Sequence, residues 1–396
     1  MRTIMFFMLF LFAASVSAQS YFPPNDSSEW DTLSPSSLDW CPEKIDSLYA
    51  FLNETNSKSF ILLKDGKIVL EQYFDEHTDS SFWYWASAGK TLSSFLVGIA
   101  QEEGFLNVND TTSDYLGSGW TYSSPEEEEK ITIWNQLTMT SGLDDGVSNP
   151  FCSDDSCLIY LAAPETRWAY HNAPYTLLRP VLENATGQGI NIYANQRLLN
   201  PIGMDGVFSY VGYDNVFSST TRSMARFGLL IQNNGEWDGT QILSDEDYFS
   251  QLVNTSQALN ESYGYLWWLN GKSSFMLPGS QFVFDGSIFP NAPNDVIAAL
   301  GKNGQIINVV PSENMVWVRM GNASSTGLVE TNLNIGVWNY INDLSCVSTV
   351  ESFTNTNSKK LIKIVDVFGR EANELKNTPL FYLYEGGLVE KKIIIE

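Results

Sequence analysis

The sequence predicts an α+β fold in which an antiparallel sheet is flanked by helices and carries an inserted helical region. Two observations support this prediction. Strand-like segments occur near both ends of the main part of the chain, and helical patterns dominate the middle. At about 300 residues, the main part is large enough to bury a substantial core as one domain.

The predicted elements follow from local patterns. Asp65-Gly66, a dipeptide typical of tight turns, separates two apolar runs and predicts a hairpin. The predicted helices cover residues 42–52, a segment opened by Ser87, and residues 220–233. The predicted strands cover residues 60–63, 68–70, 305–310 and 315–320. Because the strands come from both ends of the chain, we expect one sheet that joins them.

The segment Ser87-Ala88-Gly89-Lys90 lies where a Trp/Tyr-rich stretch meets an apolar, helical one. A serine at a helix start and a lysine three residues later face the same side, so the amine can reach the hydroxyl. Burial and the positive end of the helix dipole disfavour the charged lysine, which can then act as a neutral base. The pair is a candidate base and nucleophile, although most isolated matches to this pattern are solvated residues at helix starts.

Two further patterns offer partners for this pair. Tyr170-His171-Asn172 supplies a tyrosine that can pass a proton to a leaving group, and an amide that can bridge the lysine and a substrate carbonyl. An aromatic core turn is the alternative. Gly301-Lys302-Asn303-Gly304 precedes a predicted strand, whose edge can hold a substrate against the backbone and point amides at an oxyanion. An ordinary hairpin turn is the alternative.

Composition and missing motifs exclude several classes of function. The formal net charge of −24 would repel a phosphate backbone, so nucleic acid is not an expected partner. The two histidines, His77 and His171, cannot build a zinc site of several histidines, and no metal or other cofactor is expected. The chain has no G-x-S-x-G elbow, P-loop or G-x-G-x-x-G motif.

Taken in chain order, the three motifs resemble the serine-reactive family of penicillin-binding proteins and class C β-lactamases. The resemblance runs from about residue 40 to about residue 345, and it implies the same antiparallel sheet with an inserted helical region. It also implies four roles: Ser87 as the acylated serine, Lys90 as its base, Tyr170 as a second proton-transfer residue and Asn172 as a polar partner.

The third motif departs from the lactamase pattern. Where penicillin-recognising enzymes have Lys-Thr-Gly or His-x-Gly, this chain reads Ala299-Leu300-Gly301 before Lys302. The Gly-x-x-Gly-Gln form is more similar to 6-aminohexanoate-dimer hydrolases and to esterases of the family. That similarity implies an oxyanion hole made by the backbone amides of Ser87 and Lys302. The departure argues against efficient hydrolysis of β-lactams.

Four cysteines indicate an oxidising compartment and allow three pairings. Cys152 and Cys157 bracket a turn-like segment and are predicted to close a small loop. The family resemblance implies that the first and last helices of the domain pack together, which predicts a bond between Cys41 and Cys346. Metal binding is the competing interpretation, but the cysteines show one short spacing and no nearby histidine.

Both ends of the chain carry features of export. A basic start, an apolar run over residues 4–14 and small residues before Gln19 predict a signal peptide over residues 1–18. The hydrolase domain is expected over residues 19–347, and a linker rich in Ser, Thr and Asn over residues 348–359. No other stretch is apolar and long enough to cross a membrane, so no stable membrane span is expected.

Short strand-like segments over residues 360–396 predict a small C-terminal β module. The module resembles the C-terminal sorting domain of type IX secretion, with Asp366 and Gly369-Arg370 in its characteristic places. This resemblance implies the secretion machinery as a partner, and a location outside the cell or on its surface. A plain module that binds carbohydrate or surfaces is the alternative.

These observations together predict a secreted serine hydrolase that cleaves an ester or amide bond of a small molecule through an acyl-enzyme on Ser87. Two alternatives remain open. One is a true β-lactamase or D-amino-acid peptidase, and the other is a non-catalytic binding protein on the same scaffold.

Overall fold

The computed structural model describes residues 20–323, 327–346, 361–365, 370–373, 379–384 and 389–393. The chain divides into two compact units, Met1–Ser345 and Cys346–Glu396. The predicted signal peptide, the predicted linker, Asp366 and Gly369 lie outside the described residues.

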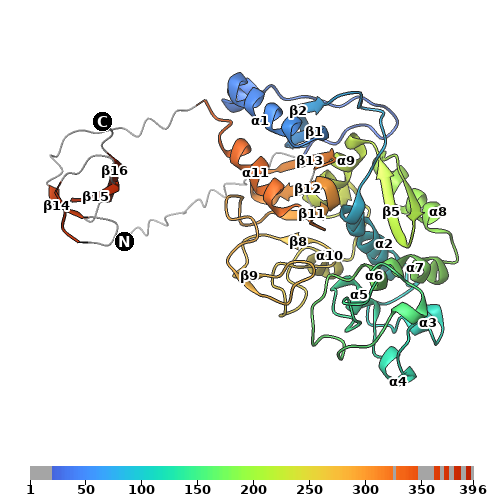
Figure 1. The fold of residues 1–396 in the computed structure, drawn as a ribbon. Coiled ribbons are helices and arrows are strands. Elements are labelled where there is room, and N and C mark those ends of the chain that lie inside the picture. Colours follow the sequence, from blue (N-terminus) through green and yellow to red (C-terminus); the bar gives the residue numbers. More distant parts are fainter. Residues whose placement is uncertain are drawn as a thin grey trace, which may run out of the picture. The chain divides into compact units, whose positions relative to one another are not determined.

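A six-stranded antiparallel sheet forms the centre of the first unit (Figure 1). The strand order is β2-β1-β13-β12-β11-β8, so the N-terminal hairpin pairs with strands from the end of the domain. The strands are β1 (Ser57–Lys64), β2 (Lys67–Tyr73), β8 (Trp268–Leu269), β11 (Ile297–Gly301), β12 (Gln305–Val310) and β13 (Met315–Gly321). The predicted antiparallel sheet is confirmed.

Helices cover both faces of this sheet. Trp338 of α11 (Thr331–Asn342) donates a hydrogen bond to Asn308 of β12. Ile307, which precedes Asn308 in β12, packs against the other helix. A Cβ added to Gly228 of α9 (Thr221–Gln232) would lie 3.2 Å from the Ile307 side chain. Successive residues of a strand point to opposite faces, so α11 and α9 cover opposite sides of the sheet. Strands buried in this way can be apolar throughout, as β11, β12 and β13 nearly are.

The N-terminal elements match their predicted positions. Helix α1 (Pro42–Glu54) starts with a proline, which suits the first helical turn, and contacts both β1 and α11. The turn between β1 and β2 places Asp65 at φ 51° and Gly66 at φ 80°. Two left-handed residues in a two-residue turn match the twist of a hairpin. The predicted hairpin is therefore confirmed.

A mostly helical region is inserted between β2 and β8. Its helices are α2 (Lys90–Glu102), α3 (Ser113–Leu116), α4 (Pro125–Glu128), α5 (Ile133–Leu137), α6 (Asn172–Thr176), α7 (Leu178–Thr186), α8 (Ile190–Ala194), α9 and α10 (Glu246–Leu252). A small sheet of β3 (Trp83–Tyr84), β5 (Asp214–Ser219) and β4 (Val207–Val211) lies within it. Helix α2 is buried along nearly its whole length, so its first residues lie in the interior.

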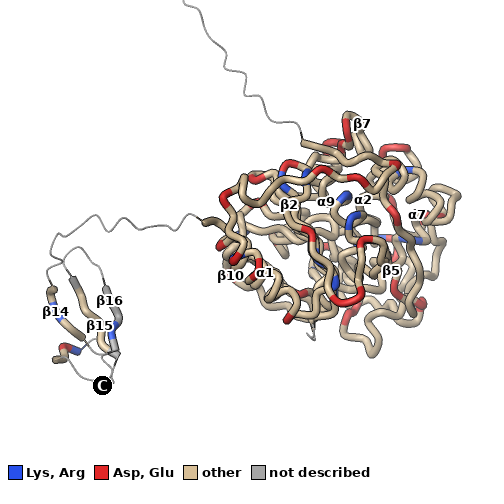
Figure 2. Tube along the Cα trace, turned by 90° about the horizontal axis from the view of Figure 1, so that it is seen from above, with Lys and Arg blue, Asp and Glu red and all other residues tan. Residues whose placement is uncertain are grey.

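Short hairpins complete the first unit, and acidic residues are spread around it (Figure 2). The hairpins are β6 (Glu236–Trp237) with β7 (Thr240–Gln241), and β9 (Ser274–Phe275) with β10 (Phe284–Asp285). No helix in the described parts of the chain is long and apolar enough to span a bilayer.

The second unit contains a three-stranded antiparallel sheet in the order β14-β15-β16. Its strands are β14 (Leu361–Val365), β15 (Pro379–Tyr384) and β16 (Val389–Ile393). Strands therefore occur where the sequence predicted a small β module.

Candidate active site

Ser87 lies on a tight turn that joins the small sheet to α2. The Trp85 amide donates to the Phe217 carbonyl at 2.8 Å, and a 3-10 turn over Ala86–Gly89 follows. Ala86 has φ 46°, in the left-handed region where a Cβ is strained. The prediction that Ser87 opens the α-helix is wrong, because α2 begins at Lys90. The two residues still face the same side, since a 3-10 turn has three residues per turn.

Lys90 is buried beside this serine. Its Nζ lies 3.3 Å from Ser87 Oγ and donates a hydrogen bond of 2.6 Å to Asn172 Oδ1. The same nitrogen lies 4.0 Å from the ring centroid of Tyr175. Burial lowers the pKa of Lys90 from 10.5 to about 7, while the charge of Asp214 acts in the opposite direction. Close to neutral pH, a large fraction of this amine is therefore unprotonated.

Tyr170 is the second titratable group beside this pair. Its ring centroid lies 5.5 Å from Lys90 Nζ, and the ring stacks on Trp268 at 5.7 Å. Burial raises the pKa of Tyr170, and a hydrogen bond with Ser87 partly offsets the rise. The phenol therefore keeps its proton at neutral pH and is available as a donor.

The end of β11 approaches the Ser87 turn very closely. A Cβ added to Gly301 would lie 2.4 Å from the Trp85 carbonyl oxygen and 2.9 Å from the Ala88 nitrogen. Only glycine permits this approach, because any side chain would collide with backbone. The next residue, Lys302, lines the same cavity as Ser87.

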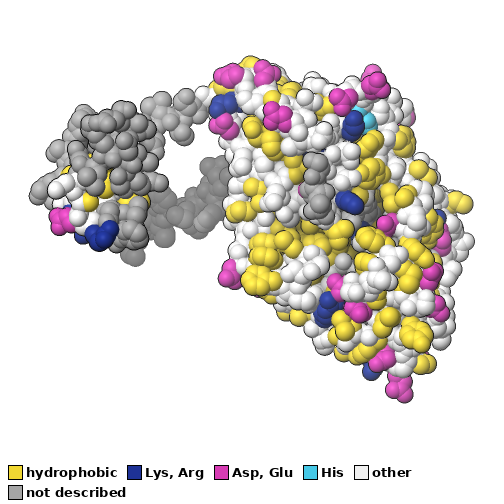
Figure 3. All heavy atoms as spheres, in the orientation of Figure 1, with side chains coloured by type: hydrophobic (Ala, Val, Ile, Leu, Met, Phe, Trp, Pro, Cys, Tyr) yellow, Lys and Arg dark blue, Asp and Glu magenta, His cyan; other side chains and the backbone are white. Residues whose placement is uncertain are grey.

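The cavity that contains Ser87 has a volume of about 420 Å³. Figure 3 shows a hollow in the surface of the first unit, with hydrophobic side chains beside it. Most of the cavity wall is apolar, and its acidic and basic side chains are Lys90, Asp214 and Lys302. The lining residues are Tyr84, Ala86, Ser87, Lys90, Phe151, Asn172, Tyr175, Val211, Asp214, Asn215, Val216, Lys302 and Leu328.

The fold brings the predicted catalytic and oxyanion residues together in this region. Ser87, Lys90, Asn172 and Lys302 line the cavity. Tyr170 is buried against Lys90, and Gly301 packs against the Ser87 turn.

Among the cavity residues that sequence reasoning missed, Tyr175 and Asp214 act on the Lys90 amine. Tyr175 follows Asn172 by three residues on α6, and this spacing was a usable signal because it places both side chains on one face. Asp214 starts β5 and belongs to no motif, so nothing in the sequence pointed to it. Burial raises the pKa of Asp214, and the nearby charges of Lys90 and Lys302 lower it in part.

His171 does not line the cavity, although it lies between Tyr170 and Asn172. The residue is 2% exposed. Burial lowers the pKa of His171 to about 4, and the charges of Asp145 and Asp144 oppose this change. The imidazole is therefore neutral at neutral pH.

A disulfide joins Cys152 and Cys157. Cys41 and Cys346 are also disulfide-bonded. Near Cys41, the backbone is tied to the end of the domain, because the Cys41 amide donates to the Leu344 carbonyl at 2.9 Å. Within the described residues, no group of three or more His, Cys, Asp and Glu side chains could hold a metal ion.

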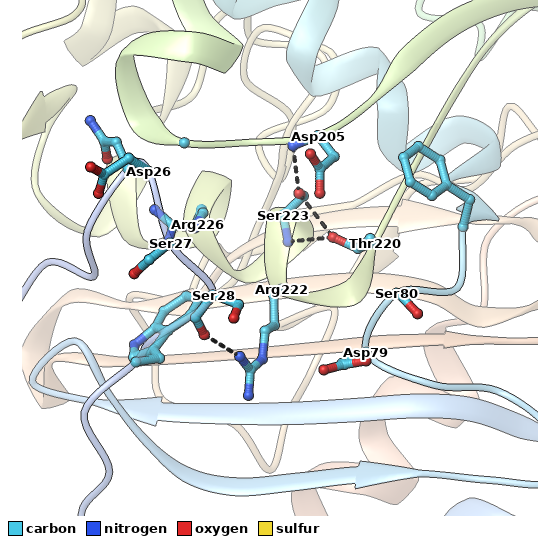
Figure 4. Close-up of a pocket in the computed structure, with 14 residues that line it drawn as sticks. Asp26, Ser27, Ser28, Asp79, Ser80, Asp205, Thr220, Arg222, Ser223 and Arg226 are labelled. Carbon is cyan, nitrogen blue, oxygen red and sulfur yellow. Dashed lines mark hydrogen bonds between the residues drawn. The ribbon is translucent and has the colours of Figure 1, made fainter.

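A larger cavity of about 560 Å³ lies between the N-terminal segment, residues 25–30, and α9 (Figure 4). It shares no lining residue with the Ser87 cavity. Its two arginines are already engaged. Arg222 donates to both carboxylate oxygens of Glu71 and to the Ser28 carbonyl, and Arg226 donates to the carbonyls of Ile202 and Pro24. We assign these contacts to the packing of the N-terminal segment.

Comparisons with solved structures give the same fold at low identity. A putative 6-aminohexanoate-dimer hydrolase from Bacillus anthracis matches with a TM-score of 0.62 and 18% identity, over 81% of this chain and 88% of that chain. A putative beta-lactamase from Bacteroides dorei matches with a TM-score of 0.59 and 14% identity, over 77% and 99%. A family VIII carboxylesterase matches with a TM-score of 0.58 and 14% identity, over 77% and 98%.

No curated protein sequence matches the chain. The beta-lactamase family model matches residues 52–335, which is more than half of the sequence and includes every motif of the cavity described above. The chain therefore belongs to the beta-lactamase family, whose fold it shares with the hydrolase and esterase structures.

Proposed function

We propose that this protein is a serine hydrolase that cleaves an ester or amide bond through an acyl-enzyme on Ser87. One observation carries most of the weight: a buried amine with a pKa of about 7 lies 3.3 Å from a serine hydroxyl at the wall of a cavity. A neutral amine can accept the serine proton, and a hydroxyl activated in this way is a nucleophile.

The proposed reaction has two halves. Lys90 takes the proton of Ser87, Ser87 Oγ attacks the substrate carbonyl, and the backbone amides of Ser87 and Lys302 stabilise the oxyanion. Tyr170 then protonates the leaving alcohol or amine as the carbonyl bond to it breaks, and Asn172 holds the Lys90 amine in place through its side-chain oxygen. In the second half, water attacks the acyl-enzyme and gives a proton to the Tyr170 phenolate, while protonated Lys90 returns a proton to Ser87 Oγ. This releases the acid and restores Ser87, Lys90 and Tyr170 to their starting states. No cofactor takes part in these steps.

The substrate proposed is an ester or a linear amide rather than a β-lactam. In the position of the lactamase Lys-Thr-Gly motif, Ala299 and Leu300 are buried side chains that cannot hold a substrate carboxylate. The solved structures with this fold include a putative 6-aminohexanoate-dimer hydrolase and a carboxylesterase. A true β-lactamase or D-amino-acid peptidase is the second candidate, supported by the family itself and by the Bacteroides dorei structure.

We also propose that the protein acts outside the cell or on its surface. The predicted signal peptide supports export, and disulfide bonds suit an oxidising compartment. The β-module sequence resembles a sorting domain of type IX secretion, which would make the secretion machinery a partner. Cell fractionation with antibody detection tests this location, and retention of the full-length protein in the cytoplasm would overturn it.

Active-site labelling tests the proposed chemistry. A fluorophosphonate should form an adduct on Ser87 in the wild type and in Ser80→Ala, which removes an exposed serine outside the cavity. Ser87→Ala and Lys90→Ala should lose the adduct. Turnover of p-nitrophenyl esters, linear amides, nitrocefin and a D-alanyl peptide then separates the two candidates. A folded wild type that forms no adduct and turns over none of these substrates would instead favour a binding protein.

A further inference from the structure

We propose that the loop closed by Cys152 and Cys157, docked on the β4–β5 hairpin, positions Phe151 in the outer wall of the Ser87 cavity, and that Phe151 limits the size of the substrate group. The inference rests on the proposed acyl transfer and adds a specificity-determining residue to it. It involves segments that none of the three motifs contains.

Two segments about 60 residues apart in the sequence contribute to the cavity wall. Phe151 directly precedes the disulfide loop, while Val211, Asp214 and Val216 come from the hairpin. All four line the cavity that contains Ser87. Val211 is 62% exposed and Phe151 is half-buried, so this part of the wall faces solvent. Groups at such a boundary determine how large a substrate can be while its carbonyl reaches the nucleophile.

A direct hydrogen bond links the two segments. Tyr213 lies in the turn between β4 and β5, and its hydroxyl donates to Asp154 Oδ2 at 2.6 Å. Asp154 lies inside the disulfide loop, between Cys152 and Cys157. The bond to this carboxylate raises the pKa of Tyr213, so the phenol remains protonated and keeps donating. The loop is therefore held against the hairpin from its own tip.

A local turn precedes the disulfide loop, and a buried residue follows it. Before it, the Phe151 amide donates to the Asn149 side chain at 3.2 Å, and the Cys152 amide donates to the Asn149 carbonyl at 3.1 Å. After it, Leu158 is fully buried in an apolar cluster apart from the main core. The other buried members of that cluster are Trp120, Ile131, Leu143 and Ala173.

The short disulfide acts locally. It spans a sequence separation of five residues, and cross-links that close short loops restrict the unfolded chain less than long ones do. Its larger effect is on the position of Phe151, which is bonded directly to Cys152. We therefore treat Cys152, Cys157, Tyr213 and Asp154 as positioning residues and Phe151 as the residue that meets the substrate.

Substrate size is the readout that tests this wall. Phe151→Ala should raise the ratio of kcat/KM for p-nitrophenyl octanoate over p-nitrophenyl acetate by about tenfold or more, because discrimination by apolar volume is typically of this size. Phe151→Leu should give an intermediate ratio, which keeps the test open if the alanine variant folds poorly. Phe105→Ala is the matched control, since Phe105 is exposed and lies outside the cavity.

A second set of variants tests the positioning residues. Tyr213→Phe and the double variant Cys152→Ser/Cys157→Ser should shift the same ratio in the same direction by a smaller factor, with kcat for the acetate ester unchanged. Tyr122→Phe, at a tyrosine that is 72% exposed, should leave the ratio as it is. Wild-type turnover with an unchanged ratio in both Phe151 variants would overturn the wall while leaving the hydrolase intact. Absence of any turnover in the wild type would reject the proposed function and this inference with it.

Discussion

Replacing Lys90 by methionine should make the protein more stable at low pH while abolishing turnover. In the unfolded chain this lysine titrates at 10.5, whereas in the fold its pKa is about 7. Between these values the unfolded chain carries one more proton than the native state, so the free energy of unfolding rises with pH. A pKa difference of about 3.5 corresponds to about 5 kcal/mol of stability, which is absent below pH 7 and recovered towards pH 10.5.

The expected gain from Lys90→Met can be worked out at two pH values. Removing the amine should stabilise the fold by about 5 kcal/mol at pH 6 and by about 2 kcal/mol at pH 9. Loss of the hydrogen bond to Asn172 Oδ1 reduces both figures by about 1–3 kcal/mol, because a buried acceptor is left unpaired. The difference of about 3 kcal/mol between the two pH values does not depend on that reduction.

Urea unfolding of the wild type and of Lys90→Met at pH 6 and pH 9 measures this difference. Lys130→Met serves as the control, because Lys130 is exposed and the pH dependence of its variant should match the wild type. A stability change on Lys90→Met that is equal at both pH values would refute the reasoning, since it would mean that the folded lysine keeps its ordinary pKa.

Three predictions concern catalysis by the proposed hydrolase. The kcat/KM of the wild type should rise with pH through about 7. Asp214→Asn should move this rise to lower pH, because the Asp214 charge favours protonated Lys90. A pH–rate profile of both proteins checks the direction of this change. Tyr170→Phe should lower kcat by about 10²–10⁴-fold with little change in KM, and steady-state kinetics that show an unchanged kcat would remove Tyr170 from proton transfer. Gly301→Ala should lower kcat by about 10²–10³-fold, because a Cβ there collides with the turn that carries Ser87. Lys302→Ala keeps its backbone amide, so its kcat should stay within about threefold of the wild type. If Lys302→Ala lowered kcat as much as Gly301→Ala does, the Lys302 side chain and not its amide would be the important group.

Much of the fold was predictable because its signals are local. The Asp65-Gly66 turn and the proline at the start of α1 each determine an element within a few residues. Strands at both ends of the domain predicted one sheet that joins them, and the structure shows that β1 and β13 are the joining pair. The start of α2 was predicted wrongly, because the strained φ of Ala86 depends on how Trp85 pairs with Phe217, about 130 residues away.

Some features of the candidate site are also set by local sequence, and others only by the tertiary structure. The spacing of Ser87 and Lys90, and that of Tyr170 and Asn172, are properties of short segments, so the sequence by itself determined which side chains could act together. The tertiary structure alone decided the depressed pKa of Lys90, because desolvation depends on every segment packed around the amine. It also decided that Asp214 and Phe151 line the same cavity, since no local pattern records which distant loops meet at a wall.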